Sequence, residues 1–223
     1  MSDNLEGLAA DDKPSPGDAS KRLNDPDATK ADILAVATHE FAEKGFSGAR
    51  IDEIAERTNA SKRMIYYYYG GKEPLYQAVL EACYRRIRSV EEKVDLEHKP
   101  PLQALAELVE FTFDHHNQNE DFIRLVMVEN IHYGRSIAKL PNDINRPAID
   151  RLRDICKRGA KEGVIRADID PLDLHMSISA LCFFNVSNRY TFSTIFEVDM
   201  VSPKAAARRR KQVTEMVLKY VAP

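Results

Sequence analysis

The chain has 223 residues, 43% hydrophobic and 30% charged, so it is long enough for one sizeable core or two small ones. Its formal net charge of −3 excludes a protein coated in positive charge, so any contact with nucleic acid must be confined to a local surface. No apolar run approaches the roughly 18 residues of a membrane span and the acidic N-terminus does not resemble a signal peptide, so we expect a cytoplasmic protein without a membrane partner.

The first 26 residues combine Asp, Ser, Gly and Pro with few large apolar side chains. Such a composition cannot bury enough apolar surface to offset the entropy that is lost on ordering. We therefore expect residues 1–26 to form a disordered N-terminal tail.

Apolar residues recur at helical spacing from residue 27 to the end of the chain. The pattern predicts helices over 27–45, 51–58, 62–69, 72–94, 102–117, 121–133, 143–162, 171–192 and 205–221. Prolines stand at or near several of the predicted starts, where a missing N–H costs little. No segment shows the convincing period-two alternation of a strand, so the sequence predicts an all-α fold with about nine helices.

The second and third predicted helices form a pair around a tight turn. Asn59 and Ala60 make the turn, and Ser61 is a natural N-cap for the helix over 62–69. A short helix in this position is typical of helix-turn-helix proteins, in which it enters the major groove of DNA. From Arg57 to Lys72 the chain carries four cations and no carboxylate, as a surface that faces phosphates requires. An ordinary solvated cationic patch is the alternative interpretation.

Four consecutive tyrosines, residues 66–69, occupy the predicted third helix. Successive residues of a helix turn by about 100°, so four in a row spread around most of its circumference. Some of these rings must therefore face outward, where a tyrosine is suitable only if its ring and hydroxyl find partners.

The segment FAEKGFSGARIDEIAERTNASKRMIYYYYGGKEPLYQAVL resembles the N-terminal domain of TetR-family transcriptional regulators. The helix-turn-helix of that family ends in a Tyr-Tyr-x-Phe-x-x-Lys-Glu-x-Leu pattern, which this segment matches without a gap. The resemblance implies a three-helix DNA-binding domain over residues 27–71. It also implies a C-terminal helical bundle over 72–223 that binds an effector and dimerises.

The resemblance, together with the helical geometry, assigns roles around the predicted third helix. Tyr66 and Tyr69 are expected mostly inside, as anchors, and Tyr67 and Tyr68 are expected to face the groove. The fork of Arg63 suits guanine O6 and N7, and Lys72 matches the family lysine that grips a phosphate. The expected DNA-binding residues are Arg50, Ser61, Lys62, Arg63, Tyr67, Tyr68 and Lys72. For Arg50, a simply exposed arginine near a helix start is the alternative.

Three residues depart from the family pattern. Asn59 occupies a turn position that is usually Gly, and we expect a left-handed backbone there, which Asn tolerates. Ala49 and Met64 replace hydroxyl residues that are common in the family. The operator is therefore expected to differ from the family's better-known operators.

The resemblance implies that a small molecule among the C-terminal helices shifts the spacing of two DNA-reading heads. Aromatic side chains beside amides would suit a flat polar ligand, because buried amides would be unpaired without it. The candidate effector-binding residues are Phe111, His115, Phe122, Met127, Asn130, Ile131, Phe184, Asn185 and Asn188, with Phe183 beside them. For each of them, a place in an ordinary helical core is the alternative. Arg189 either meets an anionic ligand or caps a helix end.

The last two predicted helices provide a candidate dimer seam. One stripe consists of Val213, Met216, Val217 and Tyr220, and a facing stripe includes Met176, Phe183 and Val186. Two reading heads are also what a palindromic operator needs, so we expect a homodimer on double-stranded DNA. The basic run over 208–211 lies far along the chain from the helix-turn-helix and is interpreted as a solvated helix face.

No sequence motif indicates an enzyme, a metal site or a cofactor. His39 begins an HExxH-like segment in which Glu43 replaces the second zinc ligand. His115 and His116 adjoin and cannot share one helix face. The three cysteines, Cys83, Cys156 and Cys182, lie far apart and are expected to be plain buried or half-buried thiols.

We therefore predict a ligand-responsive transcriptional regulator, a repressor that a small-molecule effector releases from its operator. A transcriptional activator or an effector-independent DNA-binding regulator is the first alternative. A helical enzyme that binds a small polar aromatic substrate is the second.

Overall fold

The computed structural model describes residues 25–141 and 143–223, and within these ranges it contains helices and no strands. The α-helices are α2 (Pro26–Gly48), α3 (Ile51–Arg57), α4 (Lys62–Tyr69), α5 (Lys72–Glu91), α6 (Pro101–Gln118), α7 (Glu120–Ile131), α8 (Arg146–Lys161), α9 (Pro171–Ser187), α10 (Arg189–Phe196) and α11 (Pro203–Val221), with a 3-10 turn η1 at Ile137–Lys139. The predicted all-α fold is confirmed. The predicted disordered tail lies outside the described residues, except for its last two positions.

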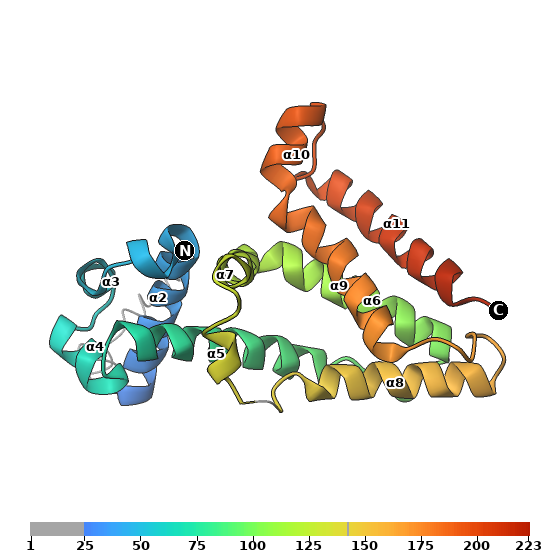
Figure 1. The fold of residues 1–223 in the computed structure, drawn as a ribbon, viewed down its shortest axis with the longest axis horizontal. Helices are drawn as coiled ribbons and strands as arrows, with labels where there is room; N and C mark the ends of the chain where they lie inside the picture. The colour runs from blue at the N-terminus through green and yellow to red at the C-terminus, as the bar shows by residue number, and fades with distance from the viewer. Residues whose placement is uncertain (1–24, 142) are drawn as a thin grey trace, which may run out of the picture.

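The helices form two groups that share one long helix (Figure 1). α2, α3 and α4 gather at one end of the molecule, and α5 begins beside α4 and runs into the second group. That group contains α6, α7, α8, α9 and α11, while α10 projects beyond the end of α9. α2 also packs directly against α7, so the two groups meet at a second place.

Side-chain caps define the starts of several helices. Asp25 Oδ1 accepts hydrogen bonds from the N–H groups of Asp27 and Ala28, so α2 begins at Pro26. Ser61 Oγ accepts from the N–H of Met64 at 3.3 Å, which confirms the predicted N-cap of α4. These acceptors satisfy N–H groups that have no partner within the first turn of a helix.

The first group is held together by an N-terminal core that extends beyond the three-helix segment. It combines Ile33, Ala37 and Phe41 of α2 with buried residues of α3 and α4, and with Leu75, Tyr76, Val79 and Leu80 of α5. Leu125 of α7 is fully buried in the same core. Burial of apolar surface therefore fixes the helix-turn-helix onto α5 and α7.

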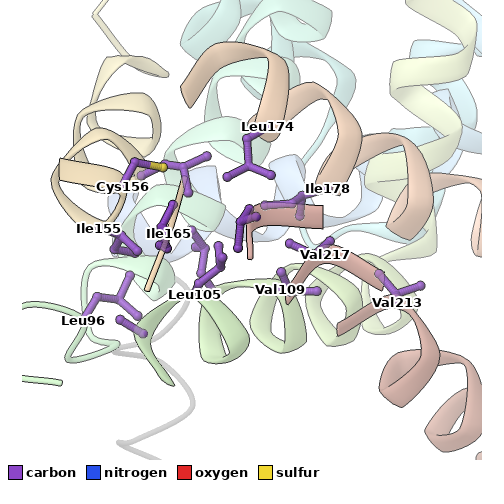
Figure 2. Close-up of a cluster of buried hydrophobic side chains, with 14 of the residues drawn as sticks. Leu96, Leu105, Val109, Ile155, Cys156, Ile165, Leu174, Ile178, Val213 and Val217 are labelled. Carbon is purple, nitrogen blue, oxygen red and sulfur yellow. The ribbon is translucent and has the colours of Figure 1, made fainter. Parts of the chain in front are cut away.

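The second group has its own core, in which side chains from α6, α8, α9 and α11 converge (Figure 2). Leu105 and Val109 of α6 lie at its centre, facing Ile178 of α9 and Val217 of α11. Two separate cores agree with the expectation from chain length.

Two helices differ from the predicted pattern. α2 was expected to end at Gly45, but the chain stays helical to Gly48 after a break at Gly45, whose φ is 65°. The predicted helix over 171–192 is divided at Asn188, where φ is −109° and ψ is 5°, and α10 begins at the next residue. Because of this division, the described ranges contain ten α-helices instead of about nine.

None of the helices in the described ranges combines the length and apolar character that crossing a bilayer would require.

Candidate nucleic-acid interface and ligand cavity

The recognition helix α4 is anchored by one apolar side chain and two tyrosines. Ile65 is fully buried, and Tyr68 and Tyr69, three and four residues later, pack against the N-terminal core. The hydroxyl of Tyr69 donates to the carbonyl oxygen of Lys30 at 3.0 Å, which ties the end of α4 to α2. These contacts leave the opposite side of α4 facing outward.

The outward tyrosines are Tyr66 and Tyr67, with exposed fractions of 47% and 82%. The prediction that Tyr66 is an inside anchor was therefore wrong. Tyr68, which was expected to face the groove, is half-buried against the N-terminal core. The inside face is set by Ile65, from which Tyr68 and Tyr69 lie within about 60° around the helix and Tyr66 about 100° away. Tyr69 inside and Tyr67 outside lie where the sequence placed them.

The turn between α3 and α4 is closed by side-chain acceptors. The N–H of Asn59 donates to Asp32 Oδ2 at 3.0 Å, and the N–H of Ala60 donates to Thr58 Oγ1 at 3.3 Å. Asn59 does not have a positive φ, so the expectation of a left-handed backbone was wrong. Since Asp32 and Thr58 supply the acceptors, the turn does not need that conformation.

Three of the predicted DNA-contacting cations are held by neighbours in the free protein. Lys62 Nζ lies 2.7 Å from Asp52 Oδ1, and this contact raises the pKa of Lys62 and lowers that of Asp52. Arg50 Nη2 lies 3.9 Å from the same carboxylate. Lys72 Nζ donates to the carbonyl oxygen of Ser47 at 3.2 Å and lies 5.0 Å from the Phe46 ring centroid.

Arg63 is the exposed cation of α4 for which the described residues provide no ion-pair partner. Its guanidinium is therefore available for a contact outside the chain. The surface contains one acid that the sequence window did not, because Asp52 of α3 lies beside the start of α4.

A fully buried carboxylate, Glu40 of α2, links α2 to the start and the end of α3. It accepts from Lys44 Nζ at 3.0 Å, from Arg57 Nη1 at 3.4 Å and from the N–H of Arg50 at 3.3 Å. Arg57, whose side chain is 46% exposed, is thus partly paired within the protein. The sequence signal was an acid on the apolar stripe of Ile33 and Ala37, which the prediction overlooked.

A central cavity of about 380 Å³ lies between α5, α6, α7, α8 and α9. Aromatic rings from four helices line it, namely Tyr84, Phe111, Phe122 and Phe183. The rings of Tyr84 and Phe122 meet edge to face, with centroids 5.3 Å apart. Of the nine candidate effector residues, the structure brings Phe111 and Phe122 into this cavity.

Polar side chains that the sequence analysis did not select also line the central cavity, namely Arg88, Glu91, His116 and His175. His116 is 6% exposed, and its Nδ1 has no partner among the described residues. Burial, followed by the positive charge of neighbouring groups, lowers the pKa of His116 to about 4, so the ring is neutral near pH 7. The sequence analysis selected His115 instead of His116. Which of these two adjacent histidines faces the cavity depends on how α6 is rotated against α9, and the sequence of α6 alone does not show this.

The other candidate effector residues lie elsewhere. His115 lines a groove between α2 and the α6–α7 junction, and Met127 and Ile131 line a shallow groove beside Tyr190. The remaining four lie outside these hollows: Asn130 donates to the carbonyl oxygen of Val126, Phe184 is exposed, Asn185 donates to Asn117 and Asn188 ends α9. Arg189 is buried and pairs with Glu120 at 3.4 Å.

The predicted dimer residues fall into three sets. Val213 and Val217 are buried in the C-terminal core and are not available to a partner, which corrects their assignment to a seam. Phe183 lines the central cavity. Met176, Met216 and Tyr220 are exposed, and Met176 belongs to an outward stripe of α9 that also contains Leu172, Ala180 and Phe184.

No group of three His, Cys, Asp or Glu side chains in the described ranges is arranged to hold a metal ion. The three cysteines are free thiols, and burial raises the pKa of Cys83 to about 11.

Comparison with known proteins places these features in context. Residues 33–79 match the family model described as bacterial regulatory proteins, tetR family, and residues 101–217 match the tetracyclin repressor-like C-terminal domain. The chain is 34% identical over 200 residues to the HTH-type transcriptional repressor NicS of Pseudomonas putida, covering 89% of this chain and 94% of that protein. It is also 34% identical over 164 residues to the HTH-type transcriptional repressor SCO4008 of Streptomyces coelicolor, covering 70% and 78%.

Among solved structures, the putative transcriptional regulator SCO4942 of Streptomyces coelicolor superposes with a TM-score of 0.65 at 25% identity. The superposition covers 87% of this chain and 99% of that one.

Proposed function

Because the chain belongs to the TetR family of bacterial transcription regulators, we propose that it is a repressor that binds a palindromic operator as a homodimer and is released by a small molecule. The observation that carries this proposal is the outward face of α4. Buried Ile65 fixes the helix, and Arg63, Tyr66 and Tyr67 project from the side away from the core. A guanidinium between phenol rings provides both base-edge donors and phosphate contacts.

The cations around α4 supply the electrostatic part of the proposed DNA contact. Lys62 is the first residue of α4, Lys72 is the first residue of α5, and Arg50 is the N-cap residue of α3. Each can replace a condensed counterion on a phosphate, which makes binding salt-dependent. The N-capping hydroxyl of Ser61 is engaged in the helix and contributes to DNA binding through the position of α4.

We assign the effector to the central cavity. It has the size and the mixture of aromatic and polar walls that small-molecule sites show. α5 connects it to the reading head, defined as α2, α3, α4 and the first turns of α5. Tyr76 of α5 donates to buried Glu129 of α7 at 2.9 Å, so movement of α7 at the cavity reaches the core of the head.

The exposed stripe of α9 is the proposed dimer surface, together with Met216 and Tyr220 of α11. An apolar row on a helix at the molecular surface needs a partner, and a second copy of the chain supplies the same row by symmetry. The family relationship and the helices without a membrane span support a DNA-binding protein of the cytoplasm rather than an enzyme.

The test is selection of duplexes by the purified full-length protein from a random DNA pool at near-physiological salt. We expect a palindrome with half-sites about one helical turn or more apart, as two symmetric heads require. Tyr67→Ala protein serves as the matched control and should retain its fold while enriching the same palindrome poorly. Absence of enrichment by the wild-type protein, or enrichment of a non-palindromic site, would contradict the proposal.

A further inference from the structure

We propose that the effector is a compact carboxylic acid, bound as its anion, with the carboxylate on Arg88. This inference rests on the proposed function, because it specifies the ligand of the central cavity. The cavity of about 380 Å³ is near the small end of the usual range for ligand sites, which favours a compact molecule.

The guanidinium of Arg88, whose side chain is 18% exposed, is only partly used by the protein. Its Nη1 donates to Glu91 one turn along α5, while its Nε is buried and has no partner among the described residues. A guanidinium presents its N–H groups in a planar fork, and a carboxylate pairs with two of them at once. The Nε–H therefore lacks the hydrogen bond that a second carboxylate would supply.

Arg88 and Glu91 are the charged side chains that line the central cavity, and a second arginine approaches Glu91 from outside it. Glu91 is the acid that pairs with Arg88, and it is also influenced by Arg151, which donates to the carbonyl oxygens of Glu91 and Glu92. Two guanidinium groups thus surround one buried carboxylate. The neighbouring histidines His116 and His175 add no positive charge near pH 7, because burial lowers the pKa of each.

The remaining walls suit the apolar part of such an acid. Tyr84, Phe122 and Phe183 present rings from three different helices, and the imidazole of His116 lies edge to face with Phe183 at 6.4 Å. The unpartnered Nδ1 of His116 offers one more hydrogen bond to a polar substituent.

The ion pair also marks a route into the cavity. Arg88, Glu91 and Ala148 line both the central cavity and a surface groove between α5 and α8. The pair therefore lies between the central cavity and the surface groove, so a ligand that enters through the groove passes Arg88.

The test compares small acids with their primary amides, which match them in shape and lack the charge. Benzoate, 2-furoate and cyclohexanecarboxylate are titrated into the full-length protein near pH 7.5 by calorimetry, each beside its amide. We expect at least one acid to bind, at least tenfold tighter than its amide, and to raise the melting temperature. Equal binding of acid and amide, or no binding by any acid, would overturn the proposal.

Variants locate the binding acid. Arg88→Lys keeps the charge without the fork and should weaken the acid at least tenfold. A double variant, Arg88→Met with Glu91→Met, removes both charges together, so that no unpaired charge stays buried, and should abolish the preference for the acid over its amide. Arg153→Met is the control, because Arg153 is exposed, pairs with Asp150 on α8 and lines neither the central cavity nor the groove. Loss of binding in Arg153→Met equal to that in Arg88→Lys would also contradict the assignment.

Failure of this inference is distinguishable from failure of the proposed function. An acid that binds through Arg88 but leaves the selected palindrome bound would uphold the ligand class and refute the release mechanism. A neutral compound that releases the protein from the palindrome, while the acids do not bind, would uphold the release mechanism and refute the ligand class.

Discussion

Single side chains around α4 divide into those that hold the helix and those that are free to contact DNA. Ile65, Tyr68 and Tyr69 hold it, and Arg63 and Tyr67 point away from the core. Lys72 belongs to neither group. The Ser47 carbonyl and the Phe46 ring fix its ammonium group near the start of α5. A fixed cation suits a phosphate, whereas a free, forked cation suits a base edge.

We expect Arg63→Ala and Lys72→Ala to weaken operator binding in different ways. Arg63→Ala should cost about 1–3 kcal/mol and relax the preference at one base pair of each half-site. Lys72→Ala should weaken all sequences alike and reduce the slope of log K against log salt by about 1. Titrations of the selected duplex and of single-base variants at several salt concentrations distinguish the two. Equal losses on every sequence for Arg63→Ala would exclude a base-reading role.

His116 makes the stability of the fold sensitive to pH. Its pKa is about 4 in the folded protein, against an ordinary value of 6.5, so between these values the unfolded chain binds more protons than the folded one. The free energy of unfolding should therefore fall as the pH is lowered through this window.

We expect His116→Phe to remove up to roughly 2 kcal/mol of the stability loss between about pH 6.5 and about pH 5, since each unit of pKa is worth about 1.4 kcal/mol. Urea denaturation at each pH measures the effect. His98→Phe is the control, because His98 is exposed. An unchanged pH profile for His116→Phe would show that another group titrates there.

At the scale of elements, the contact between α3 and α4 joins a lysine of the proposed DNA contact to an acid. Lys62 at the start of α4 lies 2.7 Å from Asp52 in the first turn of α3. Exposed ion pairs contribute little to stability, so the main effect of this pair is electrostatic, at the surface proposed to face phosphates. Asp52 holds Lys62 in place and would also repel a DNA backbone at this surface.

We expect Asp52→Asn to strengthen DNA binding several-fold at low salt and to steepen its salt dependence, because Lys62 becomes free to pair with a phosphate. Glu81→Gln on α5 changes the net charge equally and serves as the control. Weaker binding by Asp52→Asn would mean that the ion pair positions Lys62 for its contact.

Helix type and the position of most helices could be predicted from the sequence, because periodicity records which face of each helix is buried. The division at Asn188 could not, since the apolar pattern of α9 continues into α10 across it. The inside face of α4 was misjudged because the tyrosine pattern was given more weight than Ile65. Arg88 and Glu91 were missed for a similar reason: on α5 alone they resemble a solvated ion pair, and the packing of α6, α8 and α9 turns them into a cavity wall.

At the scale of the whole molecule, α9 leaves a long apolar row uncovered within the described ranges. Leu172, Met176, Ala180 and Phe184 repeat every four residues along one side of this helix and all are exposed. Val213 and Val217 of α11, in contrast, complete the chain's own core. The two roles follow from position, because α11 packs over α6 with one face and leaves Met216 and Tyr220 on the other.

We expect Met176→Glu to convert the proposed dimer to monomers at micromolar concentration and to weaken operator binding strongly, because Met176 is 65% exposed within the row and two charges would meet across a two-fold axis. Sedimentation velocity and operator titration measure the two effects. Tyr133→Glu is the matched control, an exposed aromatic on the turn after α7. A Met176→Glu protein that remained dimeric would move the interface elsewhere.

The continuity of α5 sets a rule for anyone who recombines this protein with a relative. Leu75, Tyr76 and Val79 belong to the core of the head, and Tyr84, Ile87 and Arg88 line the cavity, within one uninterrupted helix. A chimera whose junction lies between these two sets of residues must preserve the helical phase of α5. One inserted residue would rotate the reading head by about 100° and move it by about 1.5 Å relative to the helices around the cavity. The reading head and the remaining helices can therefore be exchanged between relatives only if the number of residues between the two sets is kept.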